Sequence, residues 1–352
     1  MKITSVEVAM VRIPLATPIF YRKQLISTLE SLILTLRSEN GMGQAEASGT
    51  VLPQIHLPAL AQVLETQVVP RLVGKVVSNA GESLRECLGV FAENRVIFGL
   101  AEMAWWNLDA AEKGISTIEN LGLEPVSQQV FTSLDHPVPN AEGLYEIDTF
   151  LERIAKTREE GYVHWELKVR PGWDLPMVRF VRQEFPDLSF HIDVEGGMTP
   201  EQTDILLQMR DFFPRMIEQP YEADAWRDLA ELQELLPIVC LDESITSRNV
   251  ARMAVEWNVS RCLKVNPLRV GGFAAAKEIV AYCQESKVEC WISSPLQTAV
   301  GVHNTLAVSC LDGVTGPFEY YAPQTYFGDS HFRADYPTLT QDDEGGLRIL
   351  SS

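Results

Sequence analysis

Five short apolar runs that end in a polar or charged residue follow one another through the middle of the chain: HWELK (164–168), HID (191–193), MIE (216–218), VCLD (239–242) and LKVN (263–266). They recur about every 25 residues, and helix-like segments separate them. CWIS (290–293) and GPFE (316–319) continue the spacing. Alternating strands and helices predict a parallel sheet. The regular repeat predicts an α/β fold, a (β/α)8 barrel whose functional residues lie at the carboxyl ends of the strands.

The alternation inside these runs places charge on the barrel axis. Successive residues of a strand point to opposite faces. Trp165 and Leu167 would therefore face the helices, whereas Glu166 and Lys168 would face inward. A barrel axis filled with ionisable groups is costly unless these groups are paired or bound to a metal. This pattern therefore predicts a functional site.

Composition narrows the possible partners. The chain has 352 residues, with 48 acidic and 29 basic side chains and a formal net charge of −19. This excess of acid argues against binding to nucleic acid or to anionic membranes. We expect no membrane-spanning segment or signal peptide, and we interpret the six cysteines as buried, reduced thiols of a cytoplasmic protein. The expected partner is a small molecule, and a homo-oligomer is left open.

The N-terminal third does not follow the barrel spacing. Residues 2–15 alternate as a strand, and 31–46 have the pattern of a hairpin that turns at Asn40-Gly41. Three helical segments follow, at 55–73, 81–93 and 96–113. We therefore expect an α+β domain at 1–125, completed by about 325–352, and a barrel domain at 126–324 whose first strand covers 129–134.

Several motifs in order resemble those of a known family: LKVRPGWD (167–174), FPDL (185–188), IEQP (217–220), LDES (241–244) and RVGG (269–272). Together with Asp193 they resemble the enolase superfamily. Within it, the chain is most similar to the o-succinylbenzoate synthase and N-acylamino acid racemase branch of the muconate-lactonizing subgroup. The resemblance covers nearly the whole chain and implies a modified TIM barrel behind an N-terminal capping domain.

The resemblance implies that Asp193, Glu218 and Asp242 bind Mg²⁺, with Mn²⁺ as an alternative. The residues agree, because three carboxylates that end consecutive strands offer the oxygen ligands that Mg²⁺ prefers. The metal would stabilise the enediolate that forms when a substrate loses the proton next to its carboxylate. Lys168 matches the second lysine of the Lys-x-Lys motif, the family's acid/base. A structural ion pair of Lys168 with Asp193 or Glu195 is the alternative.

Departures from the family pattern bear on the reaction. The first lysine of Lys-x-Lys is Glu166, whose charge would favour the ammonium form of Lys168 and make it a poorer base. On the sixth strand, Asn-x-Lys is replaced by Lys264-Val265-Asn266, so an amide stands where the second catalytic lysine is expected. We take Lys168, Lys264 and Asn266 as the catalytic positions. The expected substrate-binding or supporting residues are Glu166, Glu195, Ser293, Ser294, Gln297 and Tyr21.

The lost lysine at 266 favours one reaction over another. Racemisation needs a proton acceptor on one face of the substrate and a donor on the other, whereas a syn dehydration can use one lysine for both transfers. We therefore predict α-proton abstraction by Lys168 and syn β-elimination of water, as the resemblance to the o-succinylbenzoate synthase of menaquinone biosynthesis implies. Two alternatives stay open. One is a racemase or dipeptide epimerase in which Lys264 pairs with Glu166 or reaches the substrate. The other is a metal-binding member that has lost its chemistry and serves as a binding or scaffold protein.

Overall fold

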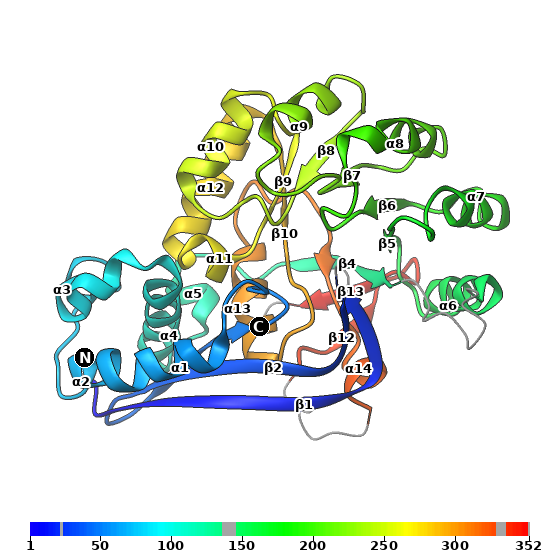
Figure 1. Ribbon diagram of the computed structural model, residues 1–352. Helices are drawn as coiled ribbons and strands as arrows, with labels where there is room; N and C mark the ends of the chain where they lie inside the picture. Colours follow the sequence, from blue (N-terminus) through cyan, green and yellow to red (C-terminus); the bar gives the residue numbers. More distant parts are fainter. Residues whose placement is uncertain (22–23, 136–145, 329–335, 351–352) are drawn as a thin grey trace.

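Two sheets organise the chain in the computed structural model, which describes all residues except 22–23, 136–145, 329–335 and 351–352 (Figure 1). The first sheet is antiparallel and has the order β1–β2–β3. Its strands are β1 (Ser5–Tyr21), β2 (Gln24–Arg37) and β3 (Met42–Ser48). The expected hairpin is therefore present, with its turn at Asn40-Gly41. Figure 1 shows β1 and β2 running beneath the barrel.

The capping domain is completed by five helices: α1 (Leu57–Val63), α2 (Val69–Leu72), α3 (Glu82–Leu88), α4 (Arg95–Lys113) and α5 (Thr117–Asn120). A π-helical turn at Leu64–Val68 joins the first two. The longest helix, α4, starts at Asn94, whose side chain accepts the N–H groups of Val96 and Ile97. It packs directly on β3, because a Cβ on Gly43 would lie 2.1 Å from the backbone nitrogen of Leu108.

Eight parallel strands of the described chain build the barrel. They are β4 (Ser127–Leu134), β5 (His164–Lys168), β6 (Phe190–Asp193), β7 (Ile217–Glu218), β8 (Val239–Leu241), β9 (Cys262–Val265), β10 (Glu289–Ile292) and β11 (Phe318–Glu319). Neighbours follow chain order from β4 to β10, and β11 returns to β4. Between β10 and β11 the contact is looser, where the backbone N–H of Thr315 donates to the carbonyl of Cys290 at 2.8 Å. The predicted barrel with a capping domain is confirmed.

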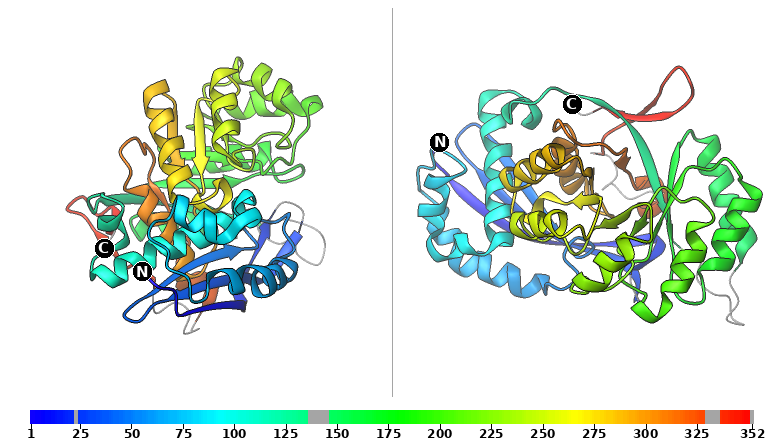
Figure 2. Two further views of the ribbon diagram at one scale, coloured as in Figure 1. Left: turned by 90° about the vertical axis from the view of Figure 1, so that its left-hand side faces the viewer. Right: turned by 90° about the horizontal axis from the view of Figure 1, so that it is seen from above.

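Helices cover the outside of the barrel, as apolar stripes on its strands require. They are α6 (Ile147–Glu159), α7 (Leu175–Glu184), α8 (Thr203–Arg210), α9 (Trp226–Gln233), α10 (Arg248–Glu256), α12 (Phe273–Ser286) and α13 (Ala299–Ser309). The short helix α11 (Pro267–Val270) instead lies against α4, where Arg95 donates to the carbonyl of Arg269 at 3.2 Å. The right-hand view in Figure 2 places the blue and cyan capping domain and the green helices α6 to α8 on opposite sides. Within the described ranges, no helix is both long enough and apolar enough to cross a bilayer. All six cysteines are free thiols, and five of them are buried.

The C-terminal segment divides its contacts between the two domains. The helix α14 (Pro323–Phe327) lies on β1, where the Thr17 hydroxyl donates to the carbonyl of Thr325 at 2.9 Å. The hairpin of β12 (Leu339–Gln341) and β13 (Leu347–Leu350) instead pairs with β4, although a strand returning to the first domain was expected. β13 pairs with residues 127–129 at the start of β4, and the backbone N–H of Leu347 donates to the carbonyl of Gly161, ahead of β5, at 2.7 Å. The domain boundaries stay a prediction.

Candidate active site

Buried polar side chains close the carboxyl end of the barrel, one from each strand or from the residue just after it. Around the barrel they are Asp135, Lys168, Asp193, Glu218, Asp242, Asn266, Ser293 and Glu319. Each is at most 9% exposed. Because all eight strands are parallel, their carboxyl ends meet at one face, and the predicted site residues from consecutive strands are brought together there.

Lys168 is held by three carboxylates. Its Nζ lies 2.6 Å from Asp193, 3.0 Å from Glu166 and 3.0 Å from Glu195. Burial acts to lower the pKa of Lys168, but Asp193, then Glu166 and Glu195, raise it well above its usual value. The lysine is therefore an ammonium in this arrangement. The ion pairs with Asp193 and Glu195, considered from the sequence as an alternative to catalysis, are present.

Lys264 forms the ion pair with Glu166 that the sequence suggested. Its Nζ lies 2.8 Å from Glu166, 3.0 Å from Glu218 and 3.7 Å from Glu319, and its side chain is 2% exposed. Burial alone would raise the pKa of Glu166, but Lys168 and Lys264 hold it well below its usual value. Glu166 is thus an anion shared by the ammonium groups of Lys168 and Lys264. The family has a lysine at this position, and the charge of Lys264 balances the acid that replaces it here.

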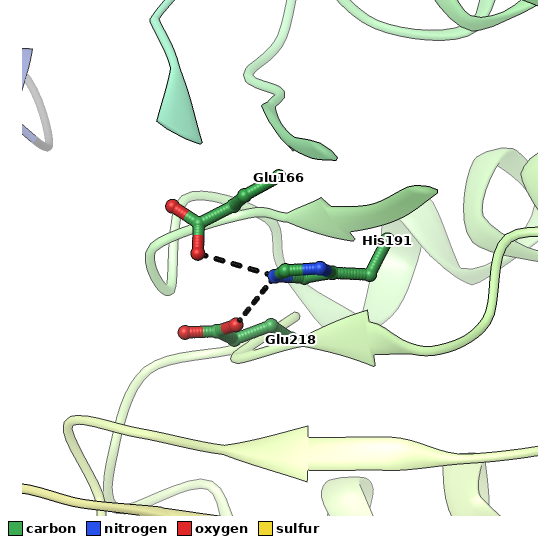
Figure 3. A group of neighbouring side chains, drawn as sticks. All are labelled: Glu166, His191 and Glu218. Carbon is green, nitrogen blue, oxygen red and sulfur yellow. Dashed lines mark hydrogen bonds and ion pairs between the residues drawn. The ribbon is translucent and has the colours of Figure 1, made fainter. Parts of the chain in front are cut away.

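Two histidines lie beneath this cluster. His191 Nε2 is 3.1 Å from carboxylate oxygens of both Glu166 and Glu218 (Figure 3). Its Nδ1 is 2.8 Å from His164 Nε2. Both histidines are therefore hydrogen-bonded core residues. In the described part of the chain, Glu166, His191 and Glu218 are also the group of three whose ligand atoms all lie within 4.8 Å of one another. The ammonium of Lys264 already bridges the two carboxylates of this group.

Asp242 pairs with a cation from the short helix that follows the next strand, β9. Arg269, on α11, donates to both of its carboxylate oxygens, at 2.8 Å and 3.0 Å. Burial would raise the pKa of Asp242, but Arg269 lowers it below its usual value. The three predicted metal ligands therefore each face a basic side chain: Lys168 beside Asp193, Lys264 beside Glu218 and Arg269 beside Asp242.

The charge balance of the site fits a divalent cation. Burial, with neighbouring acids, raises the pKa of Glu195 and Glu319 to about 7 and that of Glu243 to about 8, and raises that of Glu218 well above its usual value. These raised pKa values indicate that the site buries more acidic groups than the positive charges of Lys168, Lys264 and Arg269 can neutralise. Oxygen donors with surplus negative charge suit Mg²⁺ or Mn²⁺. The assignment of Asp193, Glu218 and Asp242 as its ligands stays a prediction.

Asn266 has a structural task that its predicted catalytic position did not suggest. Its Oδ1 accepts the N–H groups of Leu268 and Arg269 at the start of α11, at 3.1 Å and 3.2 Å. Its Nδ2 donates to the carbonyl of Ser293 at 3.0 Å. Both ends of the amide are engaged, so Asn266 caps α11. Its catalytic role stays a prediction.

The other predicted supporting residues have different positions. Ser293 Oγ lies 3.4 Å from the Arg269 guanidinium. The N–H of Ser294 donates to Glu319 at 2.8 Å, and its hydroxyl contacts Thr305. Gln297 is buried, and its carbonyl accepts the hydroxyl of Tyr336. Tyr21 ends β1, and its side chain lies outside the described residues.

The cavity between these residues is small, about 30 Å³. The capping domain closes it with Ile19, Phe20 and Thr50. The Phe20 ring packs under the Arg170 guanidinium, whose carbon lies 4.1 Å from the ring centroid. Because the cavity is far smaller than the roughly 300–1,000 Å³ of most small-molecule sites, we expect these capping residues to move before a substrate enters.

Sequence reasoning missed several residues of this site. Asp135 follows β4 and lines the cavity, as does Tyr321, two residues after Glu319. Ser133 donates its hydroxyl to Glu166 at 2.6 Å. Glu319 was recognised as the end of a strand but was given no role. The signal was available for Asp135, Glu319 and Tyr321, because each of them ends or follows the first or last strand of the repeat.

Comparisons with known proteins agree with this geometry. Residues 149–347 match the family described as "Enolase C-terminal domain-like". The o-succinylbenzoate synthase of Bacillus subtilis is 29% identical over 82% of this chain and 76% of its own. The N-succinylamino acid racemase of Thermus thermophilus is 31% identical over 84% of this chain and 79% of its own.

Solved structures agree on the fold. An enolase superfamily member from Listeria innocua superposes with a TM-score of 0.84 at 23% identity, covering 99% of this chain and 92% of its own. The L-Ala-D/L-Glu epimerase of Bacillus subtilis gives a TM-score of 0.83 at 18% identity over 99% and 96%. The family match spans more than half of the chain, and it agrees with the sequence relatives and with the barrel. The chain therefore belongs to the enolase superfamily, in the muconate-lactonizing division that includes o-succinylbenzoate synthases and N-succinylamino acid racemases.

Proposed function

We propose that this protein uses Lys168 as its single acid/base to remove the proton next to a substrate carboxylate and then to eliminate water from the neighbouring carbon, as an o-succinylbenzoate synthase does. The observation that carries this choice is the engagement of Asn266, which caps α11 where a racemase would need a second amine. Lys264 lies two residues deeper on β9 and is held between Glu166 and Glu218. Lys168 is then the amine at the level of the cavity mouth.

The proposed reaction uses one face of the substrate. The free amine of Lys168 accepts the α-proton, and the electron pair of the broken C–H bond moves into the carboxylate to give an enediolate. The ammonium then returns this proton to the β-hydroxyl group. That group leaves as water while the electron pair forms the new C=C bond. One residue suffices because proton removal and proton return occur on the same side.

Asp193, Glu218 and Asp242 would hold Mg²⁺, with Mn²⁺ as a substitute. Bound metal would supply positive charge against the substrate carboxylate and would lower the pKa of a nearby ammonium. Lys168 needs this shift, because three carboxylates hold its pKa well above the usual value. Glu195 and Arg269 would keep the ring of charged groups in place, since each contacts a residue proposed to act.

An assay with 2-succinyl-6-hydroxycyclohexadiene carboxylate tests this proposal. We expect Mg²⁺-dependent formation of o-succinylbenzoate, and a loss of about a thousandfold or more in Lys168→Ala, the size typical for removal of an essential acid/base. The matched control is Lys156→Ala, because the Lys156 side chain is 76% exposed and far from the barrel axis, and it should retain full activity. Turnover that survives Lys168→Ala would refute the single-base assignment.

Racemisation is the second candidate, favoured by the buried ammonium of Lys264 beside the same acids and by the racemases among the relatives. N-succinyl amino acids in D₂O distinguish the two. Deuterium that enters the recovered substrate with inversion at the α-carbon would select a racemase and give Lys264 the second proton transfer. No turnover of either substrate class, combined with tight Mg²⁺ binding by calorimetry, would select a metal-binding member without this chemistry.

A further inference from the structure

Two buried polar side chains at the barrel mouth have no hydrogen-bond partner among the described residues. Asp135, which follows β4, is 5% exposed, and Tyr321, two residues after β11, is 7% exposed. Both line the cavity of the candidate active site. We propose that these two residues bind the β-hydroxyl group of the substrate and so select β-hydroxy carboxylates. This inference rests on the proposed function, because it places the group that leaves as water.

The carboxylate of Asp135 is an acceptor that the described part of the chain leaves unused. Arg153, on α6, donates to the backbone carbonyl of Asp135 at 3.3 Å and not to its carboxylate. The ammonium of Lys168 is held by three other carboxylates. Burial raises the pKa of Asp135 to about 6, although Lys168 and Arg153 act to lower it, so the group is an anion at neutral pH. Its oxygens keep accessible surface at the cavity, where a substrate donor can reach them.

The hydroxyl of Tyr321 is the second unused group. An edge contact with Tyr326 fixes its ring, with the two ring centroids 5.2 Å apart. Burial raises the pKa of Tyr321 well above its usual value, so the hydroxyl keeps its hydrogen. A buried tyrosine hydroxyl usually has a hydrogen-bond partner, and within the described ranges this one has none. Tyr321 therefore has a hydrogen to donate to a group in the cavity.

Together the two residues favour a group that both donates and accepts a hydrogen bond. The anion of Asp135 can only accept, whereas the hydroxyl of Tyr321 can donate. An alcohol matches both, because its hydrogen can go to Asp135 while its oxygen accepts from Tyr321. An ammonium group can only donate, so it would leave the hydrogen of Tyr321 without an acceptor. A second carboxylate at this point would be repelled by the charge of Asp135.

The place of this pair in the barrel fits a substituent on the β-carbon. Around the barrel the order of strands is β11, β4, β5, β6, β7 and β8. Lys168 ends β5, and the proposed metal ligands lie on its β6 to β8 side. Asp135 and Tyr321 lie on the other side of Lys168, whose charge acts on both. A substrate whose carboxylate faces the metal side therefore places its α-carbon beside Lys168 and its β-hydroxyl toward this pair.

This arrangement accounts for each hydrogen during the elimination. Lys168 returns the α-proton to one lone pair of the β-oxygen, while Tyr321 donates to the other. The C–O bond breaks, its electron pair stays with the oxygen, and water leaves with the hydrogen that Asp135 accepted. Asp135 remains a carboxylate throughout. Because an oxygen that gains a proton becomes a stronger donor, its hydrogen bond to Asp135 strengthens as the reaction proceeds.

Calorimetry at saturating Mg²⁺ tests this inference with three ring acids. We expect trans-2-hydroxycyclohexanecarboxylate to bind about tenfold or more tightly than cyclohexanecarboxylate, which lacks the hydroxyl, and than trans-2-aminocyclohexanecarboxylate, which carries an ammonium group. Equal or weaker binding of the hydroxy acid would overturn the inference. The comparison needs no turnover, so this result would leave the Lys168→Ala assay of the proposed function unaffected. Failure of all three acids to bind would instead overturn the proposed carboxylate site, and this inference with it.

Two variants of similar size locate the effect. Asp135→Asn removes the anion and Tyr321→Phe removes the hydroxyl, so each should reduce the preference for the hydroxy acid at least threefold. Binding of cyclohexanecarboxylate should stay unchanged in both, which shows that the site is still folded. The matched controls are Asp211→Asn, at a side chain that is 69% exposed after α8, and Tyr282→Phe, on α12, and both should keep the full preference. A preference that survives in both active-site variants would contradict the assignment.

Discussion

Replacing Glu166 by glutamine should reveal how strongly the buried charges depend on one another. Glu166 is 1% exposed and contacts four polar partners: Lys168 at 3.0 Å, Lys264 at 2.8 Å, Ser133 at 2.6 Å and His191 at 3.1 Å. Breaking a buried ion pair from one side costs about 3–5 kcal/mol, because the other charge stays buried without compensation. Lys264 keeps Glu218 as a second partner, so we expect about 3 kcal/mol for Glu166→Gln.

Urea unfolding measures this loss, and an exposed pair provides the comparison. Arg227 and Glu231 also form an ion pair at 2.9 Å, but their side chains are 88% and 64% exposed. Glu231→Gln, the same chemical change in water, should cost at most about 0.5 kcal/mol. If Glu166→Gln costs no more than Glu231→Gln, the buried network does not stabilise the fold and the reasoning is wrong.

A double-mutant cycle assigns the effect to the pair. Lys264→Met removes the ammonium and keeps an unbranched side chain of similar length. If Glu166 and Lys264 compensate each other, the double variant should be about 2 kcal/mol more stable than the two single losses predict. Additive losses would show that Glu166 acts through its other partners.

Three further outcomes are expected. The buried Glu102 accepts N–H groups at the start of α12, and burial raises its pKa to about 7, so its neutral form stabilises the fold fully below about pH 4.5 and this contribution is lost as the pH rises through 7. Relative to the Glu102→Gln variant, the protein should lose about 3 kcal/mol of unfolding free energy between pH 4.5 and pH 8. If urea unfolding gives the same pH dependence for both proteins, this expectation is wrong. Gly43→Ala places a Cβ 2.1 Å from the backbone of Leu108 and should lower the free energy of unfolding by about 3 kcal/mol or prevent folding. Gly49→Ala, whose new Cβ has its nearest contact at 3.4 Å, should change the melting temperature little. Equal melting temperatures for the two variants would show that α4 does not pack as closely on β3 as described. Asn266→Lys restores the family's lysine but removes the cap of α11, so the unfolding free energy should fall by about 1–2 kcal/mol. Asn266→Ser keeps a capping oxygen and should lose less unfolding free energy. A lysine variant as stable as the unchanged protein would argue against the capping role.

The charged ring at the barrel mouth could be predicted because strand geometry is local. Alternation within a strand places Glu166 and Lys168 on one face whatever the rest of the chain does. Equal spacing of the strands then puts Asp193 and Glu218 at the same level. The sequence motifs, which occur in the same order as in the enolase superfamily, then indicated the family. The pairing of β13 with β4 was not predicted, because it joins residues far apart in the sequence, such as Arg348 and Gln129, and no local pattern encodes their register.

The sequence by itself determined which residues face the axis and at which end of the strands they gather, because side-chain direction and strand spacing are properties of the local chain. Only the tertiary structure decided which acid each cation holds. Lys264 and Glu166 are 98 positions apart, and Glu46 reaches α13 across 255 positions, to the N–H of Gly301. The closure of the barrel and the docking of the capping domain bring such partners together. An ion pair or a capping bond forms only within about 3–4 Å, and no local pattern encodes that distance.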